Sequence, residues 1–388
     1  MYRLMMRLGA GMALGIALQG PASASPEPSM VPIDVIQPSS PAPVRSESGS
    51  HLLYKLRLTS FASRDLLLDG IEAIDAGSGK VIARFSADAL ASMVGSPGLR
   101  SASDTPCLLR AGGFVIVYLD IVLEPGMPVP SALRHRISVA SPVPGSPTRV
   151  FTTPALAVST NTPVVLGAPV RGSGWLAANA LSNSSDHRRA IAVVDGMARI
   201  AQRYAIDFVK LDAQGRAFTG AAQQNGNWAG FGTGILAVAD GIVETASDDL
   251  PDNQPGSPPA YRVTPSTIGG NHVVLLLPSG HRVFYGHLRA GSLRVKPGDT
   301  VRRGQVIGEL GNSGQSDAPH LHIHVSDAPS PLAADGQPYV FERFGLQGHV
   351  PSLAVLETGE GWARPRGEKV ALRLAELPDD LAVIDFGH

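Results

Sequence analysis

Residues 312–325 read NSGQSDAPHLHIHV and carry a histidine at every second position, His320, His322 and His324. Side chains alternate between the two faces of a β-strand, so this spacing places all three imidazoles on one face. The residues that alternate with them are aliphatic and would face an apolar core. We therefore interpret the segment as a strand with one hydrated, imidazole-rich face and one buried face.

Two interpretations of the histidine face remain open at this point. The imidazoles could be a solvated strand face, or a cluster whose hydrogen bonds are satisfied locally. They could also form a metal or acid–base site, because neutral imidazole is a common metal ligand and titrates near neutral pH. Three histidines in register beside an apolar face favour the second interpretation.

The segment GNSGQSDAPHLHIHV resembles the PHLH signature of the lysostaphin-type zinc metallopeptidases, which cut peptide bonds in bacterial peptidoglycan. Three upstream segments also resemble that family and follow its order: YAIDF, FGTGILAVADGIV and FYGHLRAGSLRVKPGDTVRRGQVIGELGNSG. All of them lie between Pro169 and Phe344. The resemblance implies a lysostaphin-like antiparallel β domain of barrel-sandwich shape (a duplicated hybrid motif), a Zn²⁺ cofactor, and peptidoglycan or another peptide as substrate.

The resemblance assigns a role to four residues. It makes Asp207 and His322 zinc ligands, His320 the general base and His287 a second assisting histidine. Asp207 also stands out without the resemblance, because it interrupts an apolar segment where an unpaired carboxylate would be costly. From the residues alone it is either a metal ligand or an aspartate that hydrogen-bonds the backbone at a strand bend.

One ligand of the family pattern is missing. The family has a histidine four residues before the aspartate, and this chain has Arg203 there. Arginine stays protonated and offers no lone pair to a metal. His187 is the nearest upstream candidate for a replacement ligand, and the alternative is that it is an exposed loop histidine.

Composition and pattern indicate an all-β protein of two domains. Charged residues make up 17% of the 388 residues and the formal net charge is -1, which gives no support to nucleic-acid binding. Short strands with turn signals between them predict a β-sandwich-like module over residues 51–150. We place the metallopeptidase domain, with its C-terminal strands, at residues 169–388, and a linker rich in proline and serine at residues 25–50.

The first 24 residues are typical of a signal peptide. Arg3 and Arg7 precede the apolar run LGAGMALGIAL, and Ala22-Ser23-Ala24 fits a small-residue cleavage site. The run is too short to span a bilayer as a helix, which needs about 20 residues. The sequence therefore predicts an exported protein, periplasmic or extracellular, with no membrane span after signal removal.

Taken together, the sequence predicts an exported zinc metalloendopeptidase acting on peptidoglycan. Two other hypotheses stay open. Because Arg203 replaces a ligand, the domain could be a degenerate, non-hydrolytic family member that binds the cell wall or activates wall hydrolases. It could also be a peptidase of other secreted proteins.

Overall fold

A computed structural model describes residues 30–95, 107–364, 367 and 369–387. The chain divides into two compact units, Met1–Val31 and Pro32–His388, and all described strands belong to the second unit. The predicted signal peptide at residues 1–24 lies outside the described residues. Strands dominate the described residues, so the predicted all-β class is confirmed. Among the described residues, no helix combines the length and the apolar character needed to cross a bilayer.

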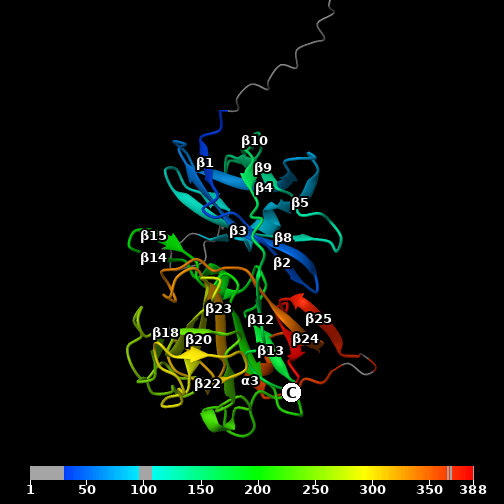
Figure 1. Ribbon diagram of the computed structural model, residues 1–388. Coiled ribbons are helices and arrows are strands. Elements are labelled where there is room, and N and C mark those ends of the chain that lie inside the picture. The colour runs from blue at the N-terminus through cyan, green and yellow to red at the C-terminus, as the bar shows by residue number, and fades with distance from the viewer. Residues whose placement is uncertain (1–29, 96–106, 365–366, 368, 388) are drawn as a thin grey trace, which may run out of the picture. The chain divides into compact units, whose positions relative to one another are not determined.

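Two sheets form the N-terminal module (Figure 1). The first sheet contains β1 (Ile33–Ile36), β2 (Pro43–Ser46), β3 (Gly49–Ser60), β6 (Val94–Gly95) and β8 (Phe114–Leu123). The second contains β4 (Leu66–Asp75), β5 (Val81–Ser86), β7 (Leu108–Leu109), β9 (Ala132–Ala140), β10 (Arg149–Thr152) and β11 (Leu156–Ala157). The short helix α1 (Ala87–Ala91) follows β5. These sheets match the predicted sandwich-like module.

The segment predicted as a linker rich in proline and serine, residues 25–50, contains the two strands β1 and β2. Strand β1 pairs with the far end of β3, and β2 pairs with its beginning. Both strands border the sheet, where a missing amide proton does no harm, so the prolines that suggested a linker are tolerated there. The end of the module also differs from residue 150, because β10 and β11 both pair with β9.

A buried polar pair links the two sheets of this module. The hydroxyl of Tyr54 in β3 lies 2.6 Å from Nε2 of His135 in β9, and His135 is fully buried. Burial raises the pKa of Tyr54 and lowers the pKa of His135 to about 4. Tyr54 therefore keeps its proton and donates it to a neutral imidazole.

This pair predicts an acid-sensitive contribution to stability. The folded-state pKa of His135 lies below its usual value of 6.5, so its contribution is fully present above pH 6.5 and is lost as the pH falls toward 4. The loss should be on the order of 3 kcal/mol in the free energy of unfolding. Urea denaturation at several pH values would measure it. His135→Gln should lose less stability than the wild type over this window, whereas His281→Gln, at a partly exposed histidine, should follow the wild type. Parallel curves for His135→Gln and wild type would contradict the assignment.

One large sheet of eleven strands carries the second module. Its order is β12-β24-β26-β13-β16-β23-β20-β19-β18-β21, with β25 paired to β24. The strands are β12 (Val164–Leu166), β13 (Trp175–Ala178), β16 (Ile206–Lys210), β18 (Gly241–Ser247), β19 (Asn271–Leu276), β20 (Arg282–Leu288), β21 (Thr300–Val301), β23 (Leu321–Ser326), β24 (Tyr339–His349), β25 (Ala371–Glu376) and β26 (Ala382–Asp385).

Smaller elements surround this sheet. They are β14 (Ala192–Val194), β15 (Met197–Arg199), β17 (Gly234–Leu236), β22 (Val306–Glu309), α2 (Asp186–Arg189), α3 (Val355–Thr358) and a single 3₁₀ turn at Asn225–Asn227. β14 pairs with β15, and β17 pairs with β22.

The predicted histidine strand is β23, and it lies in the interior of the large sheet between β16 and β20. Its aliphatic residues Leu321, Ile323 and Val325 are fully buried in the main core, as the alternation predicts. The opposite face is not hydrated as expected, since His322 is 3% exposed and His324 is 1% exposed. The ring of His187 in α2 stands edge-on to that of His322, and the ring of Phe284 in β20 stacks on that of His324, so these side chains cover that face.

Several predicted elements of this module need correction. The Asp240-Gly241 pair predicts a hairpin over Gly234 to Glu244, but β17 pairs with β22 while β18 pairs with β19 and β21. The sequence predicts a strand at Leu353–Glu357 and a loop at Ser326–Phe344, but the first contains helix α3 and the second ends in β24. The turn residues Pro278-Ser279-Gly280 predict a hairpin, which β19 and β20 form.

Candidate metal centre

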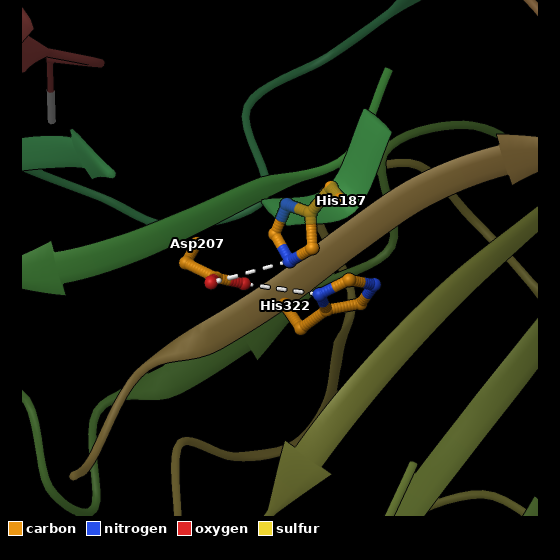
Figure 2. Close-up of side chains that lie close together, drawn as sticks. All are labelled: His187, Asp207 and His322. Carbon is orange, nitrogen blue, oxygen red and sulfur yellow. Dashed lines mark hydrogen bonds and ion pairs between the residues drawn. The ribbon is translucent and has the colours of Figure 1, made fainter. Parts of the chain in front are cut away.

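Sheet register brings the first two site residues together. Asp207 in β16 lies directly opposite His322 in β23, and side chains of directly opposed residues project from the same face of a sheet. Nδ1 of His322 is 3.0 Å from Oδ1 of Asp207. The two groups are buried, and Figure 2 shows their side chains pointing toward one another.

His187 completes the group from a different part of the chain. It lies in the one-turn helix α2, and its Nε2 is 3.3 Å from Oδ2 of Asp207. Its ring stands edge-on to that of His322, with centroids 4.8 Å apart (Figure 2). The ligand atoms of His187, Asp207 and His322 all lie within 4.8 Å of one another. The structure therefore places His187 beside the aspartate and not in an exposed loop.

Asn179 holds two of these residues, and sequence reasoning missed it. It follows β13 in the left-handed backbone region, with φ of 50°, where asparagine is one of the better tolerated residues. Its side-chain amide donates to Oδ2 of Asp207 at 3.0 Å. Its carbonyl oxygen lies 3.0 Å from Nδ1 of His187. A carbonyl can only accept, so Nδ1 of His187 carries a proton, and Nε2 is the ring nitrogen that faces the carboxylate.

This donor set fits a zinc ion. Nε2 of His187 faces a carboxylate oxygen, and in the neutral imidazole with its proton on Nδ1 this nitrogen carries the lone pair that a metal ion would take. Zinc takes histidine nitrogen and carboxylate oxygen at about 2.0–2.1 Å, so neighbouring ligand atoms of a tetrahedral site lie about 3.3 Å apart. The separations of 3.3 Å and 3.0 Å from Asp207 to the two histidines match that spacing. Catalytic zinc sites also keep three protein ligands and one open position.

Two further histidines border the same site. Nδ1 of His320 donates to the carbonyl of Ala318 at 2.8 Å, and Nδ1 of His287 donates to the carbonyl of Ser313 at 2.7 Å. Each ring therefore turns its Nε2 away from the backbone. The centroids of the two rings are 4.7 Å apart, and Nε2 of His320 is 3.4 Å from Oδ1 of Asp207. All four residues named by the family resemblance thus meet in one place.

The charges of these groups are set mainly by burial and by Asp207. Burial alone would raise the pKa of Asp207, but the charges of His187 and His320 outweigh it and hold that pKa well below its usual value. Burial lowers the pKa of His322 to about 4, and burial together with the neighbouring imidazoles lowers that of His287. These two imidazoles are neutral at neutral pH, which is the protonation state that binds a metal. For His320 the carboxylate outweighs burial and raises the pKa.

His324 contacts the ring nitrogen of His322 that does not face Asp207. Its Nδ1 lies 2.9 Å from Nε2 of His322, and its ring stacks on Phe284 with centroids 5.0 Å apart. Nε2 of His324 is buried with no hydrogen-bond partner among the described residues. The arrangement fixes the plane of the His322 ring. The sequence spacing already indicated that His322 and His324 are neighbours, because residues two apart on a strand lie on the same face.

Comparison with known proteins identifies the family of this region. The profile of peptidase family M23 matches residues 227–334, which include His287, His320 and His322. Lysostaphin of Staphylococcus simulans is 41% identical over 75 residues, which are 19% of this chain and 15% of lysostaphin. This chain carries a lysostaphin-type M23 peptidase domain. The resemblance predicted from the sequence is therefore confirmed.

Other relatives of the M23 domain match over similarly short stretches. The glycyl-glycine endopeptidase ALE-1 of Staphylococcus capitis is 40% identical over 75 residues, 19% of this chain and 20% of ALE-1. The chain therefore matches a fifth or less of the length of these relatives. The crystallised catalytic domain of lysostaphin from Staphylococcus simulans aligns with 44% of this chain and 88% of that domain, at 23% identity and a TM-score of 0.23.

The candidate metal centre lies in a cleft of about 430 Å³. The imidazoles and Asp207 line one part of the cleft, and Trp228, Leu353 and Leu356 form an apolar part of its lining. Arg203, which stands in the place of the family's usual ligand, is directed elsewhere: its Nη2 lies 3.5 Å from Oδ1 of Asp335.

Proposed function

We propose that the M23 domain is a zinc-dependent endopeptidase that hydrolyses peptide bonds in peptidoglycan. His187, Asp207 and His322 would hold the zinc ion. The observation that carries the proposal is the meeting of these three ligand atoms within 4.8 Å of one another, because it supplies the third ligand that the family pattern lacks in this chain. The degenerate, non-hydrolytic hypothesis rested on that missing ligand.

The remaining histidines would divide the proton transfers and the stabilisation of charge. A bound zinc ion supplies the Lewis acidity that activates water and polarises the scissile carbonyl. His320 would take the proton of the attacking water at Nε2, since its Nδ1 is committed to the carbonyl of Ala318. His287, with Nδ1 bound to the carbonyl of Ser313, would direct its Nε2 to the developing oxyanion.

The substrate class is supported by the relatives and by the cleft. The matching relatives include a glycyl-glycine endopeptidase and an endolysin of Staphylococcus phage 2638A. The cleft combines the polar centre with apolar side chains from Trp228 and Leu356, which suits a peptide with backbone groups at the centre and small side chains beside it. We therefore expect wall peptides to be better substrates than long folded proteins.

A combined assay tests this function. Purified protein should contain about one zinc ion per chain by elemental analysis and should release new amino termini from purified peptidoglycan. A chelator should stop the release, and added zinc should restore it. Zinc without release from peptidoglycan, but with cleavage of a secreted protein, would favour the protein-peptidase hypothesis. Absence of zinc and of cleavage, with retained binding to peptidoglycan, would favour the wall-binding module.

Export is part of the proposal. The arginines near the start and the sequence Ala22-Ser23-Ala24 support a mature protein that begins near Ser25. Expression in a bacterial host should yield a periplasmic or secreted form whose intact mass corresponds to that start. An exported protein that retains Met1 to Leu18 would contradict the predicted cleavage.

A further inference from the structure

We infer that the N-terminal β module positions the metal ligand His187, acting mainly through Arg188. This inference rests on the proposed zinc site and adds a role for the module. The segment that joins them is residues 179–191, called here the ligand loop. It leaves β13 at Asn179, forms α2 and reaches Ile191 just before β14.

The ligand loop cannot hold its own conformation. Helix α2 has four residues, and its N-cap residue Ser185 makes no side-chain cap hydrogen bond. A single helical turn is unfavourable in isolation, because its nucleation cost is not offset by propagation. Within the loop, the carbonyl of Asn179 accepts from Ser185 Oγ at 2.7 Å and from Nδ1 of His187 at 3.0 Å. These bonds tie α2 to Asn179, whose side-chain amide reaches Asp207, and the remaining contacts that fix the loop come from other parts of the chain.

Arg188 anchors the other side of the loop in the N-terminal module. Its guanidinium Nη2 lies 3.0 Å from the carbonyl oxygen of Leu119 in β8 and 3.3 Å from that of Tyr54 in β3. Tyr54 and Leu119 are directly opposed in the sheet, so one guanidinium edge spans two strands. Adjacent residues of a helix point in different directions. The same turn therefore turns Arg188 toward the module and His187 toward Asp207.

Burying the charged side chain of Arg188 has a cost in the free energy of folding. Arg188 is 3% exposed, and its Nε and Nη1 have no hydrogen-bond partner among the described residues. Burying a charge without a full set of hydrogen bonds costs free energy. Stability alone therefore does not account for an arginine here, whereas fixing the neighbouring ligand does.

Other contacts tie the ligand loop to the same strand. The side-chain amide of Asn183 donates to the carbonyl of Tyr118 in β8 at 3.0 Å. The guanidinium of Arg189 lies over the ring of Tyr118, 5.2 Å from its centre, and Ile191 packs against the cluster that includes Ile116 and Tyr118. The contacts with residues 116–119 run along the loop on both sides of His187. They hold the ligand before any metal arrives, and such preorganisation raises affinity.

The test is zinc affinity of the full chain, measured by competition with a chromophoric chelator. Arg188→Met should weaken zinc binding by about 10–100-fold, the range typical for groups that orient a metal ligand. Its apoprotein should unfold at the same temperature as the wild type or higher. Arg188→Lys keeps one donor and should lose less affinity. Arg45→Met is the matched control, because Arg45 also joins the module to the second domain, through Glu376, but does not touch the ligand loop.

A double variant separates positioning from general damage. If Arg188 acts through His187, then Arg188→Met added to His187→Ala should cause no further loss of affinity. The inference would be overturned if the losses of zinc affinity in Arg188→Met and His187→Ala were fully additive in the double variant. It would also be overturned if Arg188→Met bound zinc as tightly as the wild type. Wild-type protein that binds no zinc would remove the metal site and this inference together. Should Arg188→Met fail to fold, Asn183→Ala tests the same contact without altering a buried charge, and unchanged affinity there would overturn the inference.

Discussion

Zinc is expected to be lost when His187 is replaced by alanine, and peptide hydrolysis should disappear with it. The proposed site has three protein ligands, and one of them is the Nε2 of His187, 3.3 Å from Oδ2 of Asp207. Groups that only orient a ligand cost about 10–100-fold in metal affinity, so removal of a ligand itself should cost more. Elemental analysis after dialysis and a zinc titration would measure the loss.

Two matched variants control this experiment. His281→Ala makes the same change at a partly exposed histidine outside the proposed site and should keep its zinc. Arg203→Gln alters the residue that stands where the family has its ligand, and it should also keep its zinc because Arg203 pairs with Asp335. Asp207→Ala and His322→Ala should behave like His187→Ala. Equal zinc in wild type and His187→Ala would show that His187 is a bystander.

The second large effect is a separation of metal content from activity in His320→Ala. His320 is not one of the three residues whose ligand atoms cluster, so the variant should keep most of its zinc. Loss of a general base typically lowers the rate by about 10²–10⁴-fold. We therefore expect kcat/KM on a wall peptide to fall by that factor with a zinc stoichiometry near that of the wild type.

The same measurement can contradict the division of roles. Zinc loss in His320→Ala equal to that in His322→Ala would make His320 a ligand or a structural support. A fully active His320→Ala would remove it from the chemistry. His287→Ala offers a comparison, since the resemblance assigns it an assisting role and its Nδ1 is held by the carbonyl of Ser313.

The sequence predicts the part of the site that depends on local pattern. The alternation in the histidine strand fixes which residues share a face, and an acidic residue inside an apolar strand singles out Asp207. The sheet register then places Asp207 opposite His322. The family pattern adds His287 and His320, both of which line the cleft. These features follow from the spacing and type of residues within single short segments of the sequence.

The rest of the site depends on contacts that no short window contains. His187 comes from a four-residue helix whose position is set by β3 and β8, far away in the sequence. Asn179 contributes through a carbonyl that contacts His187 and a side-chain amide that contacts Asp207. Asparagine is common in turns of every kind, so its presence after a strand gave no sign of this role. The face of β23 was predicted to be hydrated because the pattern of one strand does not reveal that the rings of His187 and Phe284 pack on its histidines.

The misassigned elements have similar causes. Proline in residues 25–50 suggested a linker, yet β2 begins at Pro43, in an outer strand where the missing N–H is tolerated. The segment at Leu353–Glu357 is apolar and short, and in so few residues the period cannot distinguish a strand from the helix α3.

The direct opposition of Asp207 and His322 across two strands also links metal binding to correct strand pairing. A slip of one residue between β16 and β23 would send one of the two side chains to the opposite face of the sheet. The zinc ion would then bind only chains in the native register, and mass action would favour them by about 2.7 kcal/mol at a free zinc concentration one hundred times the Kd. In this chain zinc binding would therefore stabilise the native pairing of β16 and β23 selectively, and that pairing also creates the proposed catalytic site.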